Sequence, residues 1–212
     1  MTINYLTLGH DCSPAAALRN LNLREFALPF DWVISNITIL ERCFEDNFSK
    51  FHTNLKFHSN TRLVDEYGFI FPHDYPSVNT PNVHINGVGE GSFGDEIYKI
   101  SDNWINYHDV VLAKYNRRIE RFKNIVNDPD PIIVLCRYCT HDVSKLQQLF
   151  LKYYKKENVY FINSSNEIFE TDKIKNINTE KNNVWNDSDI WKRCIDNVIL
   201  HIQSLNNNIL AN

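Results

Sequence analysis

Hydrophobic residues along the chain fall into short unbroken runs and into stripes with helical spacing, and the two patterns alternate. The first strand-like segment covers residues 3–8, where Asn4 and Thr7 interrupt the apolar residues, and it stops at Gly9, which predicts a short buried strand with a sharp exit. Ser13 suits the N-cap of a helix, and Pro14 suits its first turn. The chain is therefore predicted to begin with a strand, a tight turn and a helix.

The second half of the chain repeats this alternation. Apolar positions three and four apart predict a helix over about 107–126, and the apolar run 132–136 is typical of a strand buried on both faces of a parallel sheet. A helix capped by Asp142 and a strand at 159–162 complete a strand-helix-strand unit. We therefore predict an α/β fold in a single domain, residues 1–212, whose mostly parallel sheet is covered by helices in a three-layer, Rossmann-like arrangement.

Three stretches are less regular. Residues 26–32 are densely apolar but contain a proline, which favours a short strand or an edge piece. Residues 51–105 mix strand-like pieces with loops, so we expect an irregular β-containing insertion, and we interpret its glycine-rich residues 87–94 as a flexible turn or lid. Residues 164–186 are polar and rich in Asn and Lys, which predicts a loop before a last helix that begins near Asp187.

Composition and charge narrow the range of partners. Hydrophobic residues make up 43% of the chain and charged residues 23%, as in ordinary globular proteins. The formal net charge of −4 gives no basic surplus for nucleic acid, and we interpret the basic cluster within residues 117–123 as a solvated helix face. No window holds the ~20 apolar residues of a membrane span, and residues 1–6 lack the pattern of a signal peptide. We expect a cytoplasmic protein with no membrane partner.

Among the five cysteines, Cys12 has the surroundings of a nucleophile. Scattered cysteines in a chain without an export signal are expected to be free thiols. Cys12 lies where the first strand turns into the first helix, among unpaired backbone N–H groups whose partial positive charge favours thiolate and could hold an oxyanion. A cysteine nucleophile needs both features, but a small buried core thiol can occupy the same position. The residues alone leave both interpretations open.

Several motifs follow one another in the first 75 residues: Leu8-Gly-His-Asp-Cys12, Ala17-Leu-Arg19, Phe26-Ala-Leu-Pro-Phe-Asp-Trp32 and Tyr67-Gly-Phe-Ile-Phe-Pro-His-Asp-Tyr75. Together they resemble a microbial and viral family of unknown function whose members are described as papain-like cysteine peptidases. The match extends weakly to residues 115–122, to the strand ending at Arg137 and to Trp185 and Trp191, and so covers most of the chain. The resemblance implies that Cys12 is the nucleophile and that His73 is its partner.

The position of His73 suits this role. In an extended segment the side chains of residues 67, 69, 71 and 73 share one face, so the His73 ring continues an aromatic row and is held by packing. Asp74 then points to the other face, unless the proline before His73 breaks the strand. For the third catalytic residue we therefore prefer Asp31, which lies in the segment expected near the first turn, and rank Asp74 second. A satisfied core histidine is the alternative for His73.

Substrate contacts are expected near the same turn. Arg137 falls at the carboxyl end of a predicted parallel strand, where open α/β sheets bind ligands, and it could hold a carboxylate or phosphate. We include His10 and Ser13 among the substrate-binding candidates. The motif Cys136-Arg-Tyr-Cys139-Thr-His141 brings metal-binding residue types together, but a structural zinc site takes four ligands. We predict no metal and no cofactor.

These residues predict a cysteine-dependent, peptidase-like hydrolase or acyl transferase that acts on an amide, ester or thioester of a small-molecule or peptide substrate. Cys12 attacks the carbonyl, His73 relays the proton, and N–H groups of residues 12–14 stabilise the oxyanion. The alternative is a non-catalytic α/β module that binds a small polar or sugar-phosphate ligand through Arg137. The oligomeric state stays open. A papain fold combines a helical lobe with an antiparallel barrel, which conflicts with the strand-helix-strand pattern; we follow the pattern for the fold and the resemblance for the site.

Overall fold

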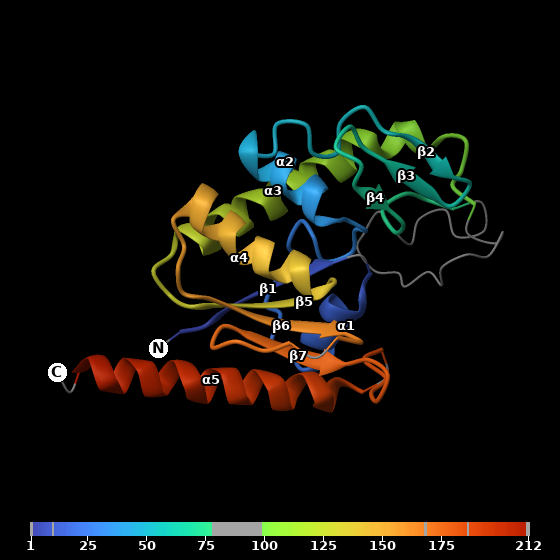
Figure 1. Ribbon diagram of the computed structural model, residues 1–212. Helices are drawn as coiled ribbons and strands as arrows, with labels where there is room; N and C mark the ends of the chain where they lie inside the picture. The colour runs from blue at the N-terminus through green and yellow to red at the C-terminus, as the bar shows by residue number, and fades with distance from the viewer. Residues whose placement is uncertain (1, 10, 78–98, 168, 186, 211–212) are drawn as a thin grey trace. The chain divides into compact units, whose positions relative to one another are not determined.

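The computed structural model describes residues 2–9, 11–77, 99–167, 169–185 and 187–210 (Figure 1). The chain divides into two compact units. Residues 1–26 and 125–212 form the first, which we call the sheet unit, and residues 27–124 form the second, the aromatic unit. The aromatic unit is thus inserted into the sequence of the sheet unit. The single domain expected from the sequence stays a prediction.

Four parallel strands form the centre of the sheet unit. They are β1 (Asn4–Gly9), β5 (Ile132–Arg137), β6 (Val159–Ser165) and β7 (Ile174–Asn178), in the spatial order β1-β5-β6-β7. Every neighbouring pair is parallel, which confirms the sheet predicted from the unbroken apolar runs. Leu8 pairs with Cys136, and Cys136 pairs with Asn163. The carboxyl ends of three strands therefore meet at one edge.

Helices cover both faces of this sheet. α1 (Ser13–Asn20) and α5 (Ser188–Leu210) lie on one face, and α4 (Thr140–Tyr154) lies on the other (Figure 1). Successive residues of β6 show the division, because strand side chains alternate between faces. Ile162 belongs to a core that includes Leu18 and Trp191, whereas the Phe161 ring lies 6.0 Å from the Phe150 ring of α4. The three-layer α/β arrangement is confirmed.

The loop predicted over residues 164–186 is partly wrong. It contains β7, whose Ile174 and Ile177 are buried against the rest of the unit. An edge strand has a single strand neighbour and few buried positions, so two isoleucines among polar residues are enough to form it. The same region holds the start of α5 in place, because the Trp191 indole N–H donates to the Val184 carbonyl at 3.0 Å.

Aromatic rings form the centre of the aromatic unit. Its elements are α2 (Ile37–Glu45), β2 (Lys56–Ser59), β3 (Arg62–Val64), β4 (Ile70–Phe71), the 3-10 helix η2 (Trp104–Tyr107) and most of α3 (His108–Asn127). The strands pair antiparallel in the order β2-β3-β4. The Phe30 ring lies 5.4–6.1 Å from the rings of Phe44, Phe48, Phe51, Phe69 and Phe122.

Residues 26–32 form turns rather than the predicted strand or edge piece. The Asp31 carboxylate accepts the Leu28 N–H at 2.9 Å, so this segment satisfies part of its backbone locally and not in a ladder. Its apolar density serves packing instead, because it delivers Phe30 to the ring core. The three short strands fall inside the insertion predicted over 51–105, and residues 87–94 lie outside the described residues.

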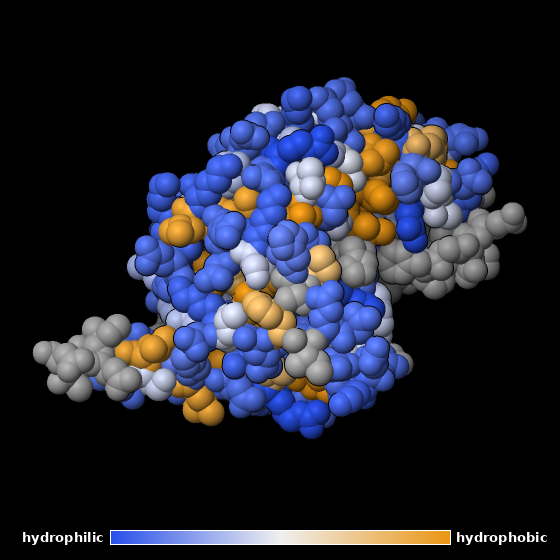
Figure 2. Space-filling model, viewed as in Figure 1, coloured by the Kyte–Doolittle hydropathy of each residue, from blue (hydrophilic) through white to orange (hydrophobic). Residues whose placement is uncertain are grey.

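Hydrophilic residues cover most of the face shown in Figure 2. None of the described helices is both long enough and apolar enough to cross a membrane.

Candidate functional site

Cys12 is the N-cap residue of α1, three positions after β1 ends. The first intrahelical hydrogen bond runs from the Ala16 N–H to the Cys12 carbonyl at 2.9 Å. Ser13, predicted as the N-cap, is instead the first residue of the helix, and Pro14 is the second. Cys12 is 2% exposed. The structure therefore places this thiol at the strand-to-helix turn and encloses it.

Asp11 organises the turn around the thiol. One carboxylate oxygen accepts both the backbone N–H of Ser13, at 2.8 Å, and the Ser13 hydroxyl, at 2.7 Å. The other oxygen accepts Nη1 of Arg137 at 2.7 Å. Arg137 is the last residue of β5, so the pair links the turn after β1 to the end of the neighbouring strand.

These contacts reduce the number of backbone N–H groups that can act as the predicted oxyanion donors. Pro14 has no N–H, and the Ser13 N–H already donates to Asp11. The Asp11 carboxylate also occupies the positive end of α1, where it opposes a thiolate, and the Arg137 guanidinium offsets that charge.

Gly9 lets β1 approach β5 closely at this edge. A Cβ atom at Gly9 would lie 3.3 Å from the backbone nitrogen of Arg137. That distance is shorter than ordinary van der Waals contact, and the neighbouring atom belongs to the backbone. Glycine thus keeps the strand ends in register directly before the Cys12 turn.

Asn163 is a residue of this edge that the sequence interpretation missed. Its side-chain oxygen accepts the Tyr138 N–H, and its amide nitrogen donates to the Tyr138 carbonyl, both at 2.9 Å. The same nitrogen donates to Asn176 at 3.1 Å. The side chain is buried and ties together the segments that follow or contain three strands. The signal was a polar residue directly after the apolar run of β6.

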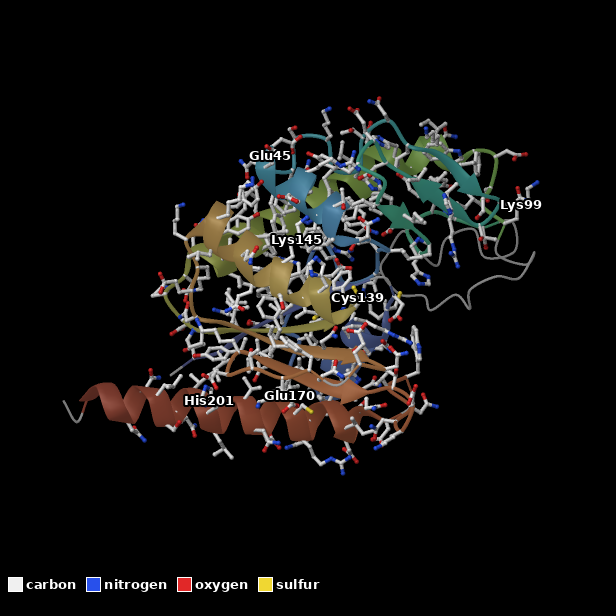
Figure 3. The ribbon with its side chains drawn as sticks, viewed as in Figure 1. Glu45, Lys99, Cys139, Lys145, Glu170 and His201 are labelled. Carbon is white, nitrogen blue, oxygen red and sulfur yellow. The ribbon has the colours of Figure 1, made fainter. Side chains whose placement is uncertain are left out.

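The other thiols of the sheet unit differ from Cys12. Cys136 is buried inside β5, and burial raises the pKa of its thiol. Cys139, labelled in Figure 3, is exposed at the start of α4, and its pKa is also raised, chiefly by partial burial. Within the described ranges, no three His, Cys, Asp or Glu side chains are grouped so that they could hold a metal ion.

His73 lies in the aromatic unit, two residues after the end of β4. Its ring is half-buried and packs edge-on against the Trp32 ring, with 6.3 Å between centroids. Tyr67, Phe69 and Phe71 are buried. β4 ends at Phe71, so the strand alternation does not extend to His73 or to the residue after it.

The two acid candidates of the aromatic unit are held differently. Both oxygens of Asp74 are bonded to α3, one by Lys114 Nζ and the other by the Tyr115 hydroxyl, each at 2.6 Å. Burial alone would raise the Asp74 pKa, but the charges of Lys114 and then Arg118 outweigh it and hold that pKa well below the usual range. Asp31 is buried and has one oxygen on the Leu28 N–H.

Arg118 is an exception to the solvated basic face predicted over residues 117–123. It is 8% exposed, whereas Arg117 is exposed as expected. Three positions separate Arg118 from the buried Tyr115, so the two share a face of α3, and the guanidinium carbon lies 5.1 Å from the Tyr115 ring centre. Charge composition alone could not separate this arginine from its neighbours.

The candidate residues thus come from both units. Cys12, Ser13 and Arg137 belong to the sheet unit, and Asp31, His73 and Asp74 belong to the aromatic unit. Ser13 and Arg137 both bond to Asp11, the residue directly before Cys12, so these contacts surround one turn. His10 lies outside the described residues.

A parallel α/β unit with a cysteine at the start of its first helix is the class of protein that these observations define. Residues 3–165 match the family described as "Putative papain-like cysteine peptidase (DUF1796)". The match spans more than half of the chain, so the protein belongs to this family, which confirms the resemblance read from its motifs. No curated protein and no solved structure matches the chain.

Proposed function

We propose that this protein is a cysteine-dependent hydrolase or acyl transferase with Cys12 as its nucleophile. The observation that carries the proposal is the place of Cys12, as N-cap of the first helix at the carboxyl edge of a parallel sheet. Membership of a family described as cysteine peptidases supports it. Nucleophiles at such turns are positioned by the backbone, which also supplies donors for developing charge.

The proposed reaction has two stages. The Cys12 sulfur attacks the carbonyl carbon of an amide, ester or thioester, and His73 takes the thiol proton and gives it to the leaving group. The resulting thioester is then cleaved by water, or by an amine or alcohol acceptor, whose proton passes through His73 before the thiol is restored. Backbone N–H groups of the turn at residues 12–14 stabilise the oxyanion in both stages.

The surrounding residues have supporting roles in this proposal. Asp11 and Arg137 fix the turn that carries the thiol. Asp31 is preferred as the residue that orients His73, because both oxygens of Asp74 already bond to α3. Ser13 and Arg137 are proposed to contact the substrate. Because Arg137 already pairs with Asp11, it is less able to bind an anionic ligand by itself. This disfavours the alternative function, a non-catalytic module that binds its ligand through Arg137.

The thiol titration tests the nucleophile directly. The protein is treated with iodoacetamide across a pH series, and alkylation of each cysteine is followed by peptide mass spectrometry. We expect Cys12 to react well below pH ~8.5, the ordinary thiol range. Cys139 is the internal control, because it is exposed and its pKa is raised. A Cys12 that reacts only with the profile of an ordinary thiol contradicts the proposed nucleophile.

The partnership of Cys12 and His73 needs a separate test, because the proposal requires residues of the two units to meet. In a His73→Cys variant, mild oxidation is expected to join the introduced thiol to Cys12, since a disulfide needs Cα atoms within about 7 Å. The matched control is His58→Cys, which places a thiol on the exposed β2 strand. Mapping of the disulfides decides the outcome. Equal cross-linking of both variants, or of neither, rules out the pair.

A further inference from the structure

A buried cluster in the aromatic unit contains more positive than negative charge. Lys114 and Tyr115 each bond one oxygen of Asp74. The Arg118 guanidinium lies over the Tyr115 ring, and its positive charge, with that of Lys114, lowers the pKa of Asp74. His52 packs 4.7 Å from the same ring. We call these five residues the Arg118 cluster; it has two cations and one carboxylate.

The guanidinium of Arg118 is incompletely satisfied. Its Nη1 atom is buried without a hydrogen-bond partner, and across the described part of the chain the side chain makes neither a hydrogen bond nor a salt bridge. The Nδ1 atom of His52 is also buried without a partner. Burying a cation is unfavourable unless its donors are bonded; the Tyr115 ring face and the charge of Asp74, which Lys114 shares, offset this only in part. A guanidinium nitrogen can only donate, so the unpaired Nη1 of Arg118 indicates a missing acceptor.

We propose that Arg118 binds a carboxylate group of a ligand within this cluster. One carboxylate cancels the single excess positive charge and accepts from the unsatisfied Nη1. The planar guanidinium matches two carboxylate oxygens, which a chloride ion cannot imitate. A phosphate monoester carries more charge than the cluster lacks. The inference concerns binding alone, and it holds whether or not Cys12 is a nucleophile.

The full chain is titrated with sodium acetate by isothermal calorimetry, with sodium chloride adjusted to keep the ionic strength constant. Saturable binding of one acetate per chain is expected. An Arg118→Gln variant should raise the dissociation constant at least tenfold. The dissociation constant of an Arg118→Lys variant should lie between those of the unaltered chain and Arg118→Gln. Lysine keeps the positive charge but lacks the pair of N–H groups that bonds both carboxylate oxygens. Arg117→Gln is the matched control on the same helix, since Arg117 is exposed, and should bind acetate like the unaltered chain.

Three results would overturn the inference. They are absent binding to the unaltered chain, unchanged binding in the Arg118 variants, and equal or tighter binding of inorganic phosphate. If Arg118→Gln does not fold, the unaltered chain and Arg118→Lys still decide the matter. A Cys12→Ser variant should bind acetate unchanged. Failure of the thiol titration and failure of anion binding are therefore distinguishable.

Discussion

The Asp11 carboxylate and the Arg137 guanidinium join the ends of two neighbouring parallel strands, with 2.7 Å between Oδ2 and Nη1. They lie far apart in the sequence and beside each other in space, because β1 pairs with β5 up to Gly9 and Arg137. The second Asp11 oxygen holds the first residue of α1. One carboxylate therefore fixes the position of Cys12 from the strand side and from the helix side.

Replacing Asp11 tests how much this arrangement stabilises the fold. Asp11→Ala should lower the free energy of unfolding by about 1–3 kcal/mol, because it removes the acceptor of the Ser13 N–H at the start of α1 and leaves Arg137 without this partner. Asp11→Asn should cost less, since an amide oxygen still accepts from Ser13. Urea denaturation measures both. Asp172→Ala, on the exposed surface, is the control and should change stability by less than ~0.5 kcal/mol. A loss in Asp11→Ala no larger than this control is the contrary result.

The charges beside Cys12 should move its reactivity in opposite directions. Asp11→Asn removes a negative charge, so alkylation of Cys12 should begin at lower pH; Arg137→Gln removes a positive charge, so it should begin at higher pH. We expect both shifts to shrink in ~1 M salt, which screens these charges. The alkylation profile of each variant gives the answer. Shifts of the same sign in both variants would contradict the electrostatic explanation.

The parallel sheet was predictable because its central strands leave a local signal. Residues 132–136 and 159–162 are apolar without alternation, as burial on both faces requires, and they became β5 and β6. β7 leaves no such signal, since Ile174 and Ile177 stand among polar residues at the sheet edge. The turn at residues 26–32 was misjudged for the opposite reason, because its apolar side chains pack a core without joining a strand.

The candidate site was predictable only where it is local. Cys12 at a strand-to-helix turn follows from the order of neighbouring residues. The pairing of Arg137 with Asp11 does not follow from local order, because the parallel sheet brings together two residues that lie far apart in the sequence. The bonding of Asp74 to α3 and the burial of Arg118 likewise depend on tertiary packing. A charge pattern on one helix contains no information about the element that will cover it.

Asn163 should contribute more to stability than its single side chain suggests. Asn163→Leu has similar volume, but it leaves the Tyr138 N–H and carbonyl without their side-chain partner in a buried place. The expected loss is about 2–4 kcal/mol of unfolding free energy. Asn158→Leu is the matched control, because Asn158 bonds the Pro129 carbonyl in an exposed position. Thermal and urea unfolding compare the two. Similar losses in both variants would show that the Asn163 contacts are not stabilising.

Two buried groups of the aromatic unit should have opposing effects on stability as the pH changes. Burial lowers the pKa of His52 from 6.5 to about 3, although Asp74 opposes it. Burial raises the pKa of Asp65 from 3.8 to about 6, although backbone N–H groups, that of His52 among them, oppose it. As the pH falls below 6.5, His52 takes up a proton in the unfolded state but not yet in the folded state, which favours unfolding. As the pH falls below about 6, Asp65 takes up a proton in the folded state but not yet in the unfolded state, which favours folding.

Single variants should separate these effects, which nearly cancel between pH 4 and 6 in the unaltered chain. Asp65→Asn leaves the His52 effect alone, so stability should fall as the pH is lowered from 6.5, by at most about 1.4 kcal/mol per pH unit. His52→Asn leaves the Asp65 effect alone, so stability should rise as the pH is lowered from 6 to 4. Asn suits the left-handed backbone at this position, where φ is 60°. Urea denaturation at each pH, taken as the difference from the unaltered chain, isolates the group that was replaced, so the Asp65→Asn difference should fall and the His52→Asn difference should rise as the pH is lowered from 6 to 4. Parallel difference curves for the two variants would mean that these side chains do not titrate in opposition.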